Sequence, residues 1–440
     1  MPLFLDYKTP NFESKLQFFL NNNRCENKEV YSVVKSIIDA VKTQGDKALI
    51  KFTEDYDNFC VPGGVLKFSD QEIAEKISRI TMDEKKALEC AAERIRDFHV
   101  KQVPRHKKWK DANGSKLGWL WKPIAQVGIY IPGGKASYPS SVLMNAIPAK
   151  IAGVKKLVMV TPTPNGVVNP LVLLAAKISG VDEIFRIGGA QAVAALAFGT
   201  ETIPVVDKIT GPGNSYVAEA KKQLFGKVGI DMVAGPSEVL IIADHFGKPE
   251  WIAMDLLSQA EHDSSAQAIL ITTSEKFIQE VVRKLECKLK TLKRREIATS
   301  SWEKNGAVIL VKDFGQAAYI SNLIAPEHLQ LCVTNPEKLL KKIDNAGSVF
   351  IGAWTPEALG DYILGVNHVL PTERAARFSS VLSVVDFMKR IPVSEATPKS
   401  IARIGPYAEV LAESEGLHAH KVSISLRLRE IKQMYKNGKR

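Results

Sequence analysis

Apolar residues recur at helical spacing through most of the first hundred residues. The clearest stretch covers residues 30–41, and residues 83–100 form a second, charged and amphipathic stretch. This part of the chain predicts helices and contains no group of residues arranged for chemistry.

Beyond residue 124, short β-branched and apolar runs alternate with helical stretches. The expected strands cover residues 127–131, 157–160, 184–187 and 203–209, and the expected helices cover residues 170–178, 190–198 and 215–225. Strands that alternate with helices favour a parallel sheet with helices on both faces.

A second alternating series follows. Its expected strands cover residues 239–243, 268–272, 308–311 and 349–351, and its helices cover residues 250–260 and 275–292. Beyond Ser383 the chain is helical and basic, which predicts a C-terminal appendage rather than a third sheet. The expected fold is therefore α/β. It has two similar Rossmann-like parallel-sheet units, each an incomplete dinucleotide fold, with a helical N-terminal segment and a helical C-terminal tail.

Length and composition restrict the class of protein. With 440 residues the chain exceeds what one compact core usually organises, so at least two domains are expected. Hydrophobic residues make up 45% and charged residues 24%, and no apolar run reaches the roughly 18–20 residues needed to cross a bilayer. The N-terminus lacks the features of a secretory or transit peptide. We expect a cytoplasmic protein that does not enter a membrane.

The cysteines are odd in number, scattered and never in a Cys-x-x-Cys pair: Cys25, Cys60, Cys90, Cys287 and Cys332. Neither disulfides nor a thiolate zinc site are expected. A bound metal would therefore have nitrogen and oxygen ligands.

The net charge of +11 raises the question of an acidic partner. Basic residues cluster at 107–108, 288–295 and 427–440, but no aromatic residues are interleaved with them, and no zinc-finger, RNP-like or helix-turn-helix pattern is present. Solvated surfaces explain these clusters better than nucleic acid does. Salt-dependent retention on DNA would discriminate between the two.

Three glycine-rich turns lie where the first α/β unit would bind a nucleotide, at the carboxyl ends of its strands. They cover residues 130–134, 188–191 and 211–214, and none is Gly-x-Gly-x-x-Gly. Taken singly, each is more often a tight turn that needs a positive φ at glycine. Together the three turns favour a ligand more strongly, and a ligand contact would explain why Gln191 is the one polar side chain in an otherwise apolar helix. Asn214 is an expected N-cap of the helix after the third turn.

Four segments far apart in the chain carry groups that could hold one divalent ion. Gln259 and His262 are three residues apart, so a helix would place them on one face. Asp361 would add a carboxylate from a turn and His420 a second imidazole, for a zinc or manganese site. His418 lies two residues from His420 and cannot readily bind the same ion, so one of these two is expected to be structural. By spacing alone, each histidine is more often a hydrogen-bonded residue than a ligand.

Glu327 and His328 follow a proline and precede the strand-like residues 329–333. The histidine could act as a general base near neutral pH, and the glutamate could orient water. The alternative is a polar surface turn. A zinc hydrolase would need a metal-activated water and no dinucleotide, and the three glycine turns argue against it.

Over almost the whole chain, from Gly45 to the C-terminal helix, the sequence closely resembles the histidinol dehydrogenase family. The resemblance rests on the motifs at residues 127–134, 138–148, 188–192, 211–217, 230–238, 259–263, 325–329 and 367–372. It implies an NAD- and zinc-dependent four-electron oxidation of L-histidinol to L-histidine through an enzyme-held aldehyde, with two NAD molecules reduced in succession.

The same resemblance implies roles for individual residues. Zinc, one ion per subunit, would be bound by Gln259, His262, Asp361 and His420, and NAD would be contacted by Tyr130, Gln191 and Asn214. The substrate contacts would be Ser237, Gln259, His262, His328, Asp361, Glu415 and His420. His328 would take the hydroxyl proton in each oxidation, and Glu327 would activate the water that hydrates the aldehyde.

The resemblance also implies a division of the chain. Residues 1–22 would form an N-terminal helical segment, 23–128 and 238–382 the α/β catalytic and metal domain, and 129–237 the α/β NAD-binding domain. Residues 383–440 would form a helical tail that contributes to the partner subunit's site. The matching family is dimeric with an exchanged tail, so we expect a homodimer with sites shared between subunits.

The chain departs from the commoner family pattern after Thr372. It reads Glu-Arg-Ala-Ala-Arg-Phe-Ser-Ser-Val, where many members have a glycine-bearing turn followed by Ser-Gly. Sister enzymes of similar sequence oxidise other small polyols, including sulfonated diols, and this is the alternative function. Glu415 argues against it, because a carboxylate suits a cationic substrate and repels a sulfonate.

Overall fold

The computed structural model describes residues 2–21, 28–133 and 138–436 of the chain. Contacts divide the chain into two compact units, each of which combines two segments. The larger unit consists of Met1–Gln102 and Ile124–Phe387, and the smaller unit of Val103–Pro123 and Met388–Arg440. The larger unit contains both parallel sheets.

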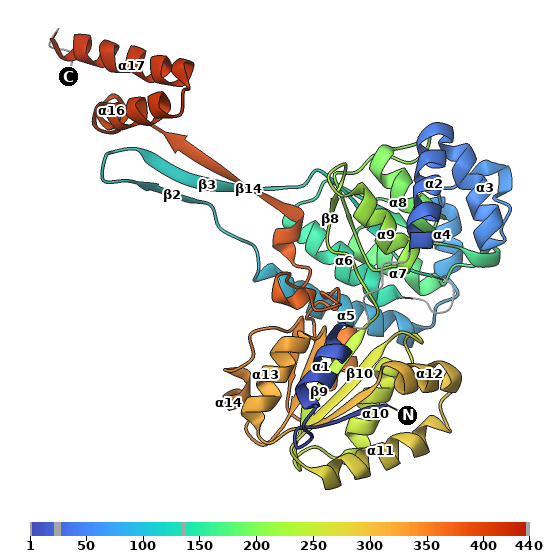
Figure 1. Cartoon of the computed structure of the whole chain (residues 1–440). Helices are drawn as coiled ribbons and strands as arrows, with labels where there is room; N and C mark the ends of the chain where they lie inside the picture. The colour runs from blue at the N-terminus through green and yellow to red at the C-terminus, as the bar shows by residue number, and fades with distance from the viewer. Residues whose placement is uncertain (1, 22–27, 134–137, 437–440) are drawn as a thin grey trace. The chain divides into compact units, whose positions relative to one another are not determined.

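The first sheet has five parallel strands in the order β6-β5-β4-β7-β8, and Figure 1 shows the helices packed around it. The strands are β4 (Gln126–Tyr130), β5 (Lys156–Val160), β6 (Glu183–Phe185), β7 (Lys208–Thr210) and β8 (Gly229–Ile230). One hydrophobic core joins it to α2 (Lys28–Gln44), α3 (Asp46–Asp57), α8 (Gly189–Phe198) and α9 (Ser215–Leu224). A second packed layer consists of α4 (Asp70–Ile77), α5 (Met82–Val100), α6 (Pro139–Ala152) and α7 (Pro170–Ser179).

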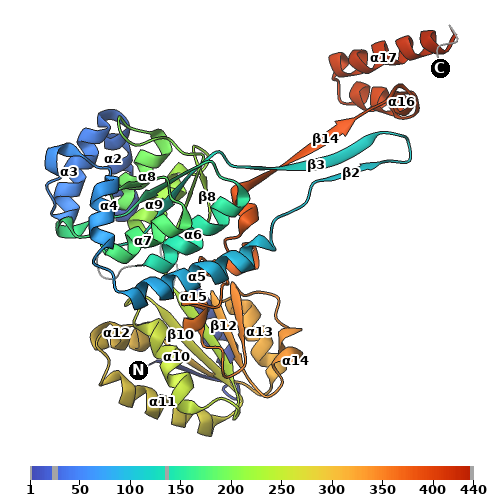
Figure 2. The same ribbon diagram turned by 180° about the vertical axis from the view of Figure 1, so that it is seen from behind.

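The second sheet has six parallel strands in the order β1-β11-β10-β9-β12-β13. They are β1 (Leu3–Asp6), β9 (Glu238–Ala243), β10 (Gln267–Thr272), β11 (Ala307–Leu310), β12 (His328–Cys332) and β13 (Ser348–Ile351). The core on one face includes α10 (Pro249–Ala260), α11 (Glu275–Leu289) and α12 (Arg295–Asn305), and the core on the other includes α1 (Phe12–Asn21), α13 (Phe314–Ile324) and α14 (Pro336–Leu340) (Figure 2).

Side-chain alternation explains why β9 is apolar from Val239 to Ala243. Val239 and Ile241 belong to the core on the α10 face, whereas Leu240 and Ile242 belong to the core on the α13 face. A strand that is buried on both sides needs apolar residues at every position, as the sequence pattern indicated.

The smaller unit combines an antiparallel sheet with a helical hairpin. Its strands follow the order β14-β3-β2: β2 (Lys107–Lys110), β3 (Lys116–Pro123) and β14 (Met388–Glu395). The hairpin consists of α16 (Pro398–Ser414) and α17 (His418–Lys436), which approach closely at Gly405, where a Cβ would lie 3.1 Å from a Leu428 methyl. Leu428 and Ile431 are among its few buried apolar side chains, and many of its other apolar residues are exposed.

The predicted α/β class with two parallel-sheet units is confirmed. The expectation that the tail forms no sheet is wrong, because β14 pairs with β3 over its whole length. The expected domain boundaries stay predictions. Residue 134 of the first glycine turn, Cys25, and the boundary at residues 22 and 23 lie outside the described residues. Within the part of the chain that is described, no helix is long and apolar enough to cross a membrane.

Candidate active site

Catalytic candidates gather at the amino ends of two neighbouring strands in the second sheet. Glu238 is the first residue of β9 and His328 is the first residue of β12, and the two strands pair in parallel. Glu327 directly precedes His328, so the acid and the imidazole that the sequence singled out are both fixed by the start of a buried strand.

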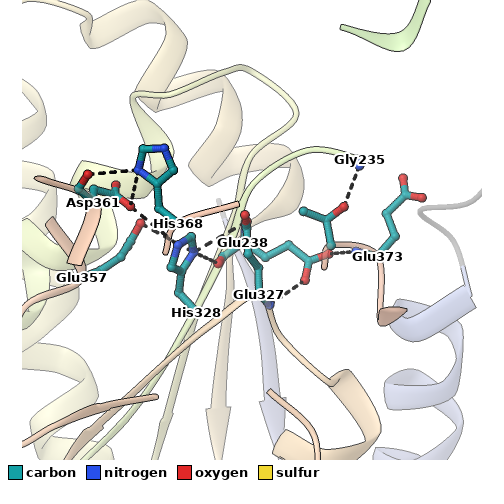
Figure 3. A network of polar contacts seen from close by, with 9 residues as sticks. Gly235, Glu238, Glu327, His328, Glu357, Asp361, His368 and Glu373 are labelled. Atoms are coloured by element: carbon teal, nitrogen blue, oxygen red, sulfur yellow. Dashed lines mark hydrogen bonds and ion pairs between the residues drawn. The ribbon is translucent and has the colours of Figure 1, made fainter. Parts of the chain in front are cut away.

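His328 is buried and its tautomer follows from its contacts (Figure 3). Its Nδ1 lies 2.9 Å from the carbonyl oxygen of Glu238, which can only accept, so Nδ1 donates. In the neutral ring the lone pair is then on Nε2. Nε2 is buried and has no hydrogen-bond partner among the described residues, and the nearest acidic oxygen is Asp361 Oδ1 at 3.9 Å. Burial lowers the pKa of His328, so Nε2 is available as a base or a ligand at neutral pH.

Glu238 and Glu327 form a reciprocal pair of hydrogen bonds, in which each side chain accepts from the backbone N–H of the other residue. The Glu238 N–H donates to Glu327 Oε2 at 2.8 Å, and the Glu327 N–H donates to Glu238 Oε2 at 3.3 Å. The other oxygen of Glu238 accepts from the Glu373 N–H at 2.9 Å. Burial raises the pKa of Glu327 well above its ordinary value, and the nearby carboxylates of Glu238, Glu357 and Asp361 act in the same direction. A carboxyl group of this kind is basic enough to activate water.

Two carboxylates reach His328 from α15 (Glu357–Tyr362). Glu357 Oε1 lies 3.6 Å from His328 Nδ1, and one atom from each of His328, Glu357 and Asp361 can be chosen so that all lie within 4.8 Å of one another. Burial, followed by the charges of Asp361 and Asp255, raises the pKa of Glu357 well above its ordinary value. Asp361 lies in α15, which is a short helix, whereas the sequence predicted a turn at this position.

A second histidine, the partly buried His368, faces the same carboxylate. Its Nδ1 donates to the carbonyl oxygen of Asp361 at 3.0 Å, so its Nε2 accepts from the Ser141 hydroxyl at 3.2 Å. Burial lowers the pKa of His368. The side chains of His328, Asp361 and His368 thus lie together (Figure 3).

Gln259 and His262, the next two predicted ligands, lie at the end of α10 and just beyond it. Gln259 is fully buried, and neither Oε1 nor Nε2 of its amide has a hydrogen-bond partner among the described residues. His262 lies just beyond the helix, so the prediction that one helix face carries both residues is wrong. The chain stays compact here because the His262 N–H donates to the Gln259 carbonyl. The His262 ring is close enough to contribute to the lowered pKa of both His328 and His368.

The donor set fits a divalent transition metal. A buried amide without partners, an imidazole lone pair and a carboxylate are nitrogen and oxygen ligands of the kind that zinc accepts. Of the predicted ligands, Gln259, His262 and Asp361 belong to the larger unit. His420 is exposed in the first turn of α17 in the smaller unit, and Glu415 is exposed at the end of α16. Ser237 immediately precedes β9.

A separate cavity of about 390 Å³ lies at the carboxyl edge of the first sheet. Tyr130, Gln191 and Asn214, the three predicted NAD contacts, all line it. The Asn214 side chain accepts from the N–H groups of Tyr216 and Val217, which confirms the predicted N-cap. Tyr130 Oη accepts from the Gly189 N–H at 3.1 Å, and burial raises the pKa of this phenol to about 12. The cavity therefore has a neutral hydroxyl and a helix N-terminus in its wall.

Two buried charged side chains, Lys221 and Asp231, hold the third glycine turn through Gly211. Gly211 has φ +113°, and a Cβ there would lie 2.1 Å from the Tyr130 carbonyl oxygen, so only glycine fits. Its N–H donates to Asp231 Oδ2 at 2.8 Å and its carbonyl accepts from Lys221 Nζ at 3.0 Å. Lys221 and Asp231 form a buried ion pair.

Sequence reasoning missed three residues of the cluster: Glu238, Glu357 and His368. Glu357 and Asp361 are four residues apart, and this spacing would have placed both carboxylates on one helix face if a helix had been predicted there. No comparable local signal existed for His368, because its neighbours Ser141 and Asp361 are brought to it by the fold.

A parallel-sheet protein with a buried histidine–carboxylate cluster and a nucleotide-sized cavity has the features of an α/β enzyme. The histidinol dehydrogenase family model matches residues 20–428. The chain is 56% identical to the histidinol dehydrogenase of Cereibacter sphaeroides over 97% of this chain and 99% of the relative. It is 52% identical to histidinol dehydrogenase 1 of a Nostoc species, over 98% of this chain and 100% of the relative. The crystal structure of histidinol dehydrogenase from Elizabethkingia anophelis superimposes with a TM-score of 0.93 at 38% identity, covering 98% of this chain and 99% of that one. The chain belongs to the histidinol dehydrogenase family.

Proposed function

We propose that this enzyme oxidises L-histidinol to L-histidine in two successive NAD-dependent steps, as part of histidine biosynthesis. Membership of the family supports the activity. The observation that carries the chemistry is the pairing of a buried imidazole, whose Nε2 has no partner among the described residues, with a buried carboxyl group next to it in the chain. The cytoplasmic location stays a prediction.

The two buried groups suit different parts of the reaction. Oxidation of the alcohol transfers a hydride to NAD and releases the hydroxyl proton, which His328 Nε2 would accept. The aldehyde must then add water, and Glu327 would take a proton from that water. The hydrate would lose a second hydride to NAD, and His328, after releasing the first proton to solvent, would accept the second hydroxyl proton.

We propose one zinc ion per subunit, held by Gln259, His262, Asp361 and His420. A zinc ion there would supply a Lewis acid that holds the imidazole and amine of the substrate. The partner-free amide of Gln259 supports this ligand set. The group of His328, Glu357 and Asp361 is a competing set. Zinc content distinguishes them: His262→Ala should lose zinc and His328→Asn should keep it, whereas the reverse would favour the competing set.

The charge of the site supports a cationic substrate. Carboxyl oxygens of Glu327, Glu357 and Asp361 lie 3.6, 3.6 and 3.9 Å from the ring nitrogens of His328, and no lysine or arginine is among the described partners of the imidazole. The substrate contacts proposed from the family, Ser237 and Glu415 included, would add a hydroxyl and another carboxylate. A sulfonated diol would meet like charge, so the sister-enzyme alternative is disfavoured.

The first test counts products. Purified enzyme with L-histidinol and NAD should form about two NADH per histidinol consumed, with histidine as the product. One NADH with release of free aldehyde would refute the four-electron reaction. Activity on another diol without activity on histidinol would favour the sister enzyme.

We further propose a homodimer in which the helical hairpin of one subunit completes the site of the other. Exposed apolar side chains of the helical hairpin and of its connecting turn support this proposal, because a partner surface would remove them from water: Ile404, Tyr407, Val410, Leu411, Leu417 and Leu426. In an isologous dimer a second copy of the chain would cover these side chains. The same arrangement would bring His420 and Glu415 of the partner subunit to each site.

Subunit mixing tests the shared site. His262→Ala and His420→Ala homodimers should each be nearly inactive, because both sites lack a ligand. In a hybrid with shared sites, one site collects both substitutions and the other none. Random pairing should then restore about a quarter of wild-type activity. Verified hybrids without activity would show that each subunit builds its own site.

A further inference from the structure

We propose that Asp57 selects NAD over NADP by contacting the ribose of the adenosine half and excluding a 2′-phosphate. The inference rests on the proposed function, because it takes the cavity at the first sheet as the NAD site. It adds a residue that neither the glycine turns nor the family motifs singled out.

Asp57 is the last residue of α3 and lies in the cavity wall together with Tyr130 and Gln191. Its Oδ2 accepts from the Thr163 N–H at 3.0 Å, which fixes the carboxylate against the loop after β5. Its Oδ1 has no hydrogen-bond partner among the described residues. The carboxylate is close enough to Tyr130 to contribute to the raised pKa of that phenol.

The chemistry of the cavity wall favours a ribose next to Asp57. The described lining residues include one carboxylate, one amide from each of Gln191 and Asn214, two further tyrosines and several apolar residues, but no lysine or arginine. A fixed carboxylate oxygen accepts hydrogen bonds from the vicinal hydroxyls of a ribose. A 2′-phosphate would instead place two negative charges against the carboxylate, with no described cation to compensate them.

The residues that line the cavity indicate which of the two riboses of NAD would lie beside Asp57. Neither His328 nor Asp361, Glu327 or His368 lines the cavity. The nicotinamide ring must lie at the group that loses the hydride, so the half of NAD in this cavity is the half that does not react. That half is the adenosine half, whose ribose carries the additional phosphate in NADP.

The experiment measures cofactor preference in the full-length enzyme. The specificity constants for NAD and for NADP are determined at saturating L-histidinol for wild type, Asp57→Asn and Asp57→Ser. The preference for NAD should fall at least about tenfold in both variants, because a like charge near the 2′-phosphate is removed. An unchanged ratio in both would overturn the proposal.

Asp55→Asn is the matched control. Asp55 is exposed on the same helix, two residues away, and does not line the cavity, so the same loss of charge there should leave the ratio within about twofold of wild type. An equal fall in the control would show a general charge effect and overturn the assignment to Asp57.

Direct binding separates this inference from the proposed function. ADP-ribose and its 2′-phosphorylated form are titrated by calorimetry, which requires no turnover. Asp57→Asn should tighten binding of the phosphorylated form relative to ADP-ribose. If Gln191→Ala weakens ADP-ribose while Asp57→Asn leaves the relative affinity unchanged, the cavity binds NAD and the inference on Asp57 fails. If neither form binds in wild type, the proposed cofactor site itself fails.

Discussion

Replacement of Lys221 by methionine tests how the cofactor cavity is held together. The Lys221 and Asp231 side chains are 2% and 1% exposed. Asp231 accepts from the Gly211 N–H, and Lys221 donates to the Gly211 carbonyl oxygen. Methionine is nearly as long as lysine, but the Lys221→Met substitution leaves Asp231 charged, buried and without its cation. Losing one partner of a buried pair costs about 3–5 kcal/mol. Because the Gly211 and Met232 N–H groups still donate to Asp231, we expect the lower end, about 3 kcal/mol.

Urea unfolding followed by circular dichroism measures the loss. The double variant Lys221→Met/Asp231→Asn should be more stable than Lys221→Met by about 1–2 kcal/mol, because no unpaired charge remains in the core. Lys222→Met, an exposed neighbour on the same helix, should change stability by less than about 0.5 kcal/mol. Since Gly211 begins the turn that leads to Asn214, NAD binding should weaken together with stability. A loss below about 1 kcal/mol for Lys221→Met, or a double variant no more stable than the single one, would refute the reasoning.

Other substitutions test single groups of the second sheet. Glu327→Gln should slow oxidation of the aldehyde more than that of the alcohol, whereas His328→Asn should slow both; equal losses in the two half-reactions for Glu327→Gln would contradict this division. Glu238→Gln keeps one acceptor for two backbone N–H groups, so kcat should fall on the order of tenfold with zinc content unchanged, and an unchanged kcat would rule out a positioning role. Burial raises the pKa of Asp255 from 3.8 to about 6, so Asp255→Asn should raise the free energy of unfolding above pH 6 by up to about 3 kcal/mol. That gain should disappear below about pH 4, where the carboxyl is protonated in both states, and a gain independent of pH would point to another cause. Glu373→Gly should raise the free energy of unfolding by about 0.5–1 kcal/mol because φ is +52°, whereas Glu373→Ala, which keeps the strained conformation, should not.

The parallel sheets were predictable because their strands are buried on both faces. An apolar run such as residues 239–243 marks a strand without knowledge of its neighbours. The strand β1 gave no such signal, because four residues become a strand only by pairing with β11. The same applies to the pairing of Lys116 with Glu395, which joins segments far apart in the chain and leaves no local pattern.

The site was predictable where the chemistry lies within one short segment. Glu327 and His328 are adjacent in sequence and remain adjacent in the structure. After Thr372, where the sequence departs from the commoner family pattern, Glu373 and Arg374 have positive φ values; this backbone conformation favours glycine, although neither residue is glycine. Pairing of the Glu373 N–H with Glu238 maintains this conformation, and no sequence pattern reports such a contact.

The two sheets use opposite edges, and the backbone explains why. In the first sheet the cavity lies at the carboxyl edge, where α8 and α9 begin and their N-termini favour phosphates. In the second sheet the residues that would carry the chemistry lie at the amino ends of β9 and β12. The N–H groups of Glu238, Glu327 and Glu373 at this edge each donate to a carboxylate oxygen. These N–H groups stabilise the acidic groups at the amino edge, and resemblance between the two sheets alone would have placed the site at the other edge.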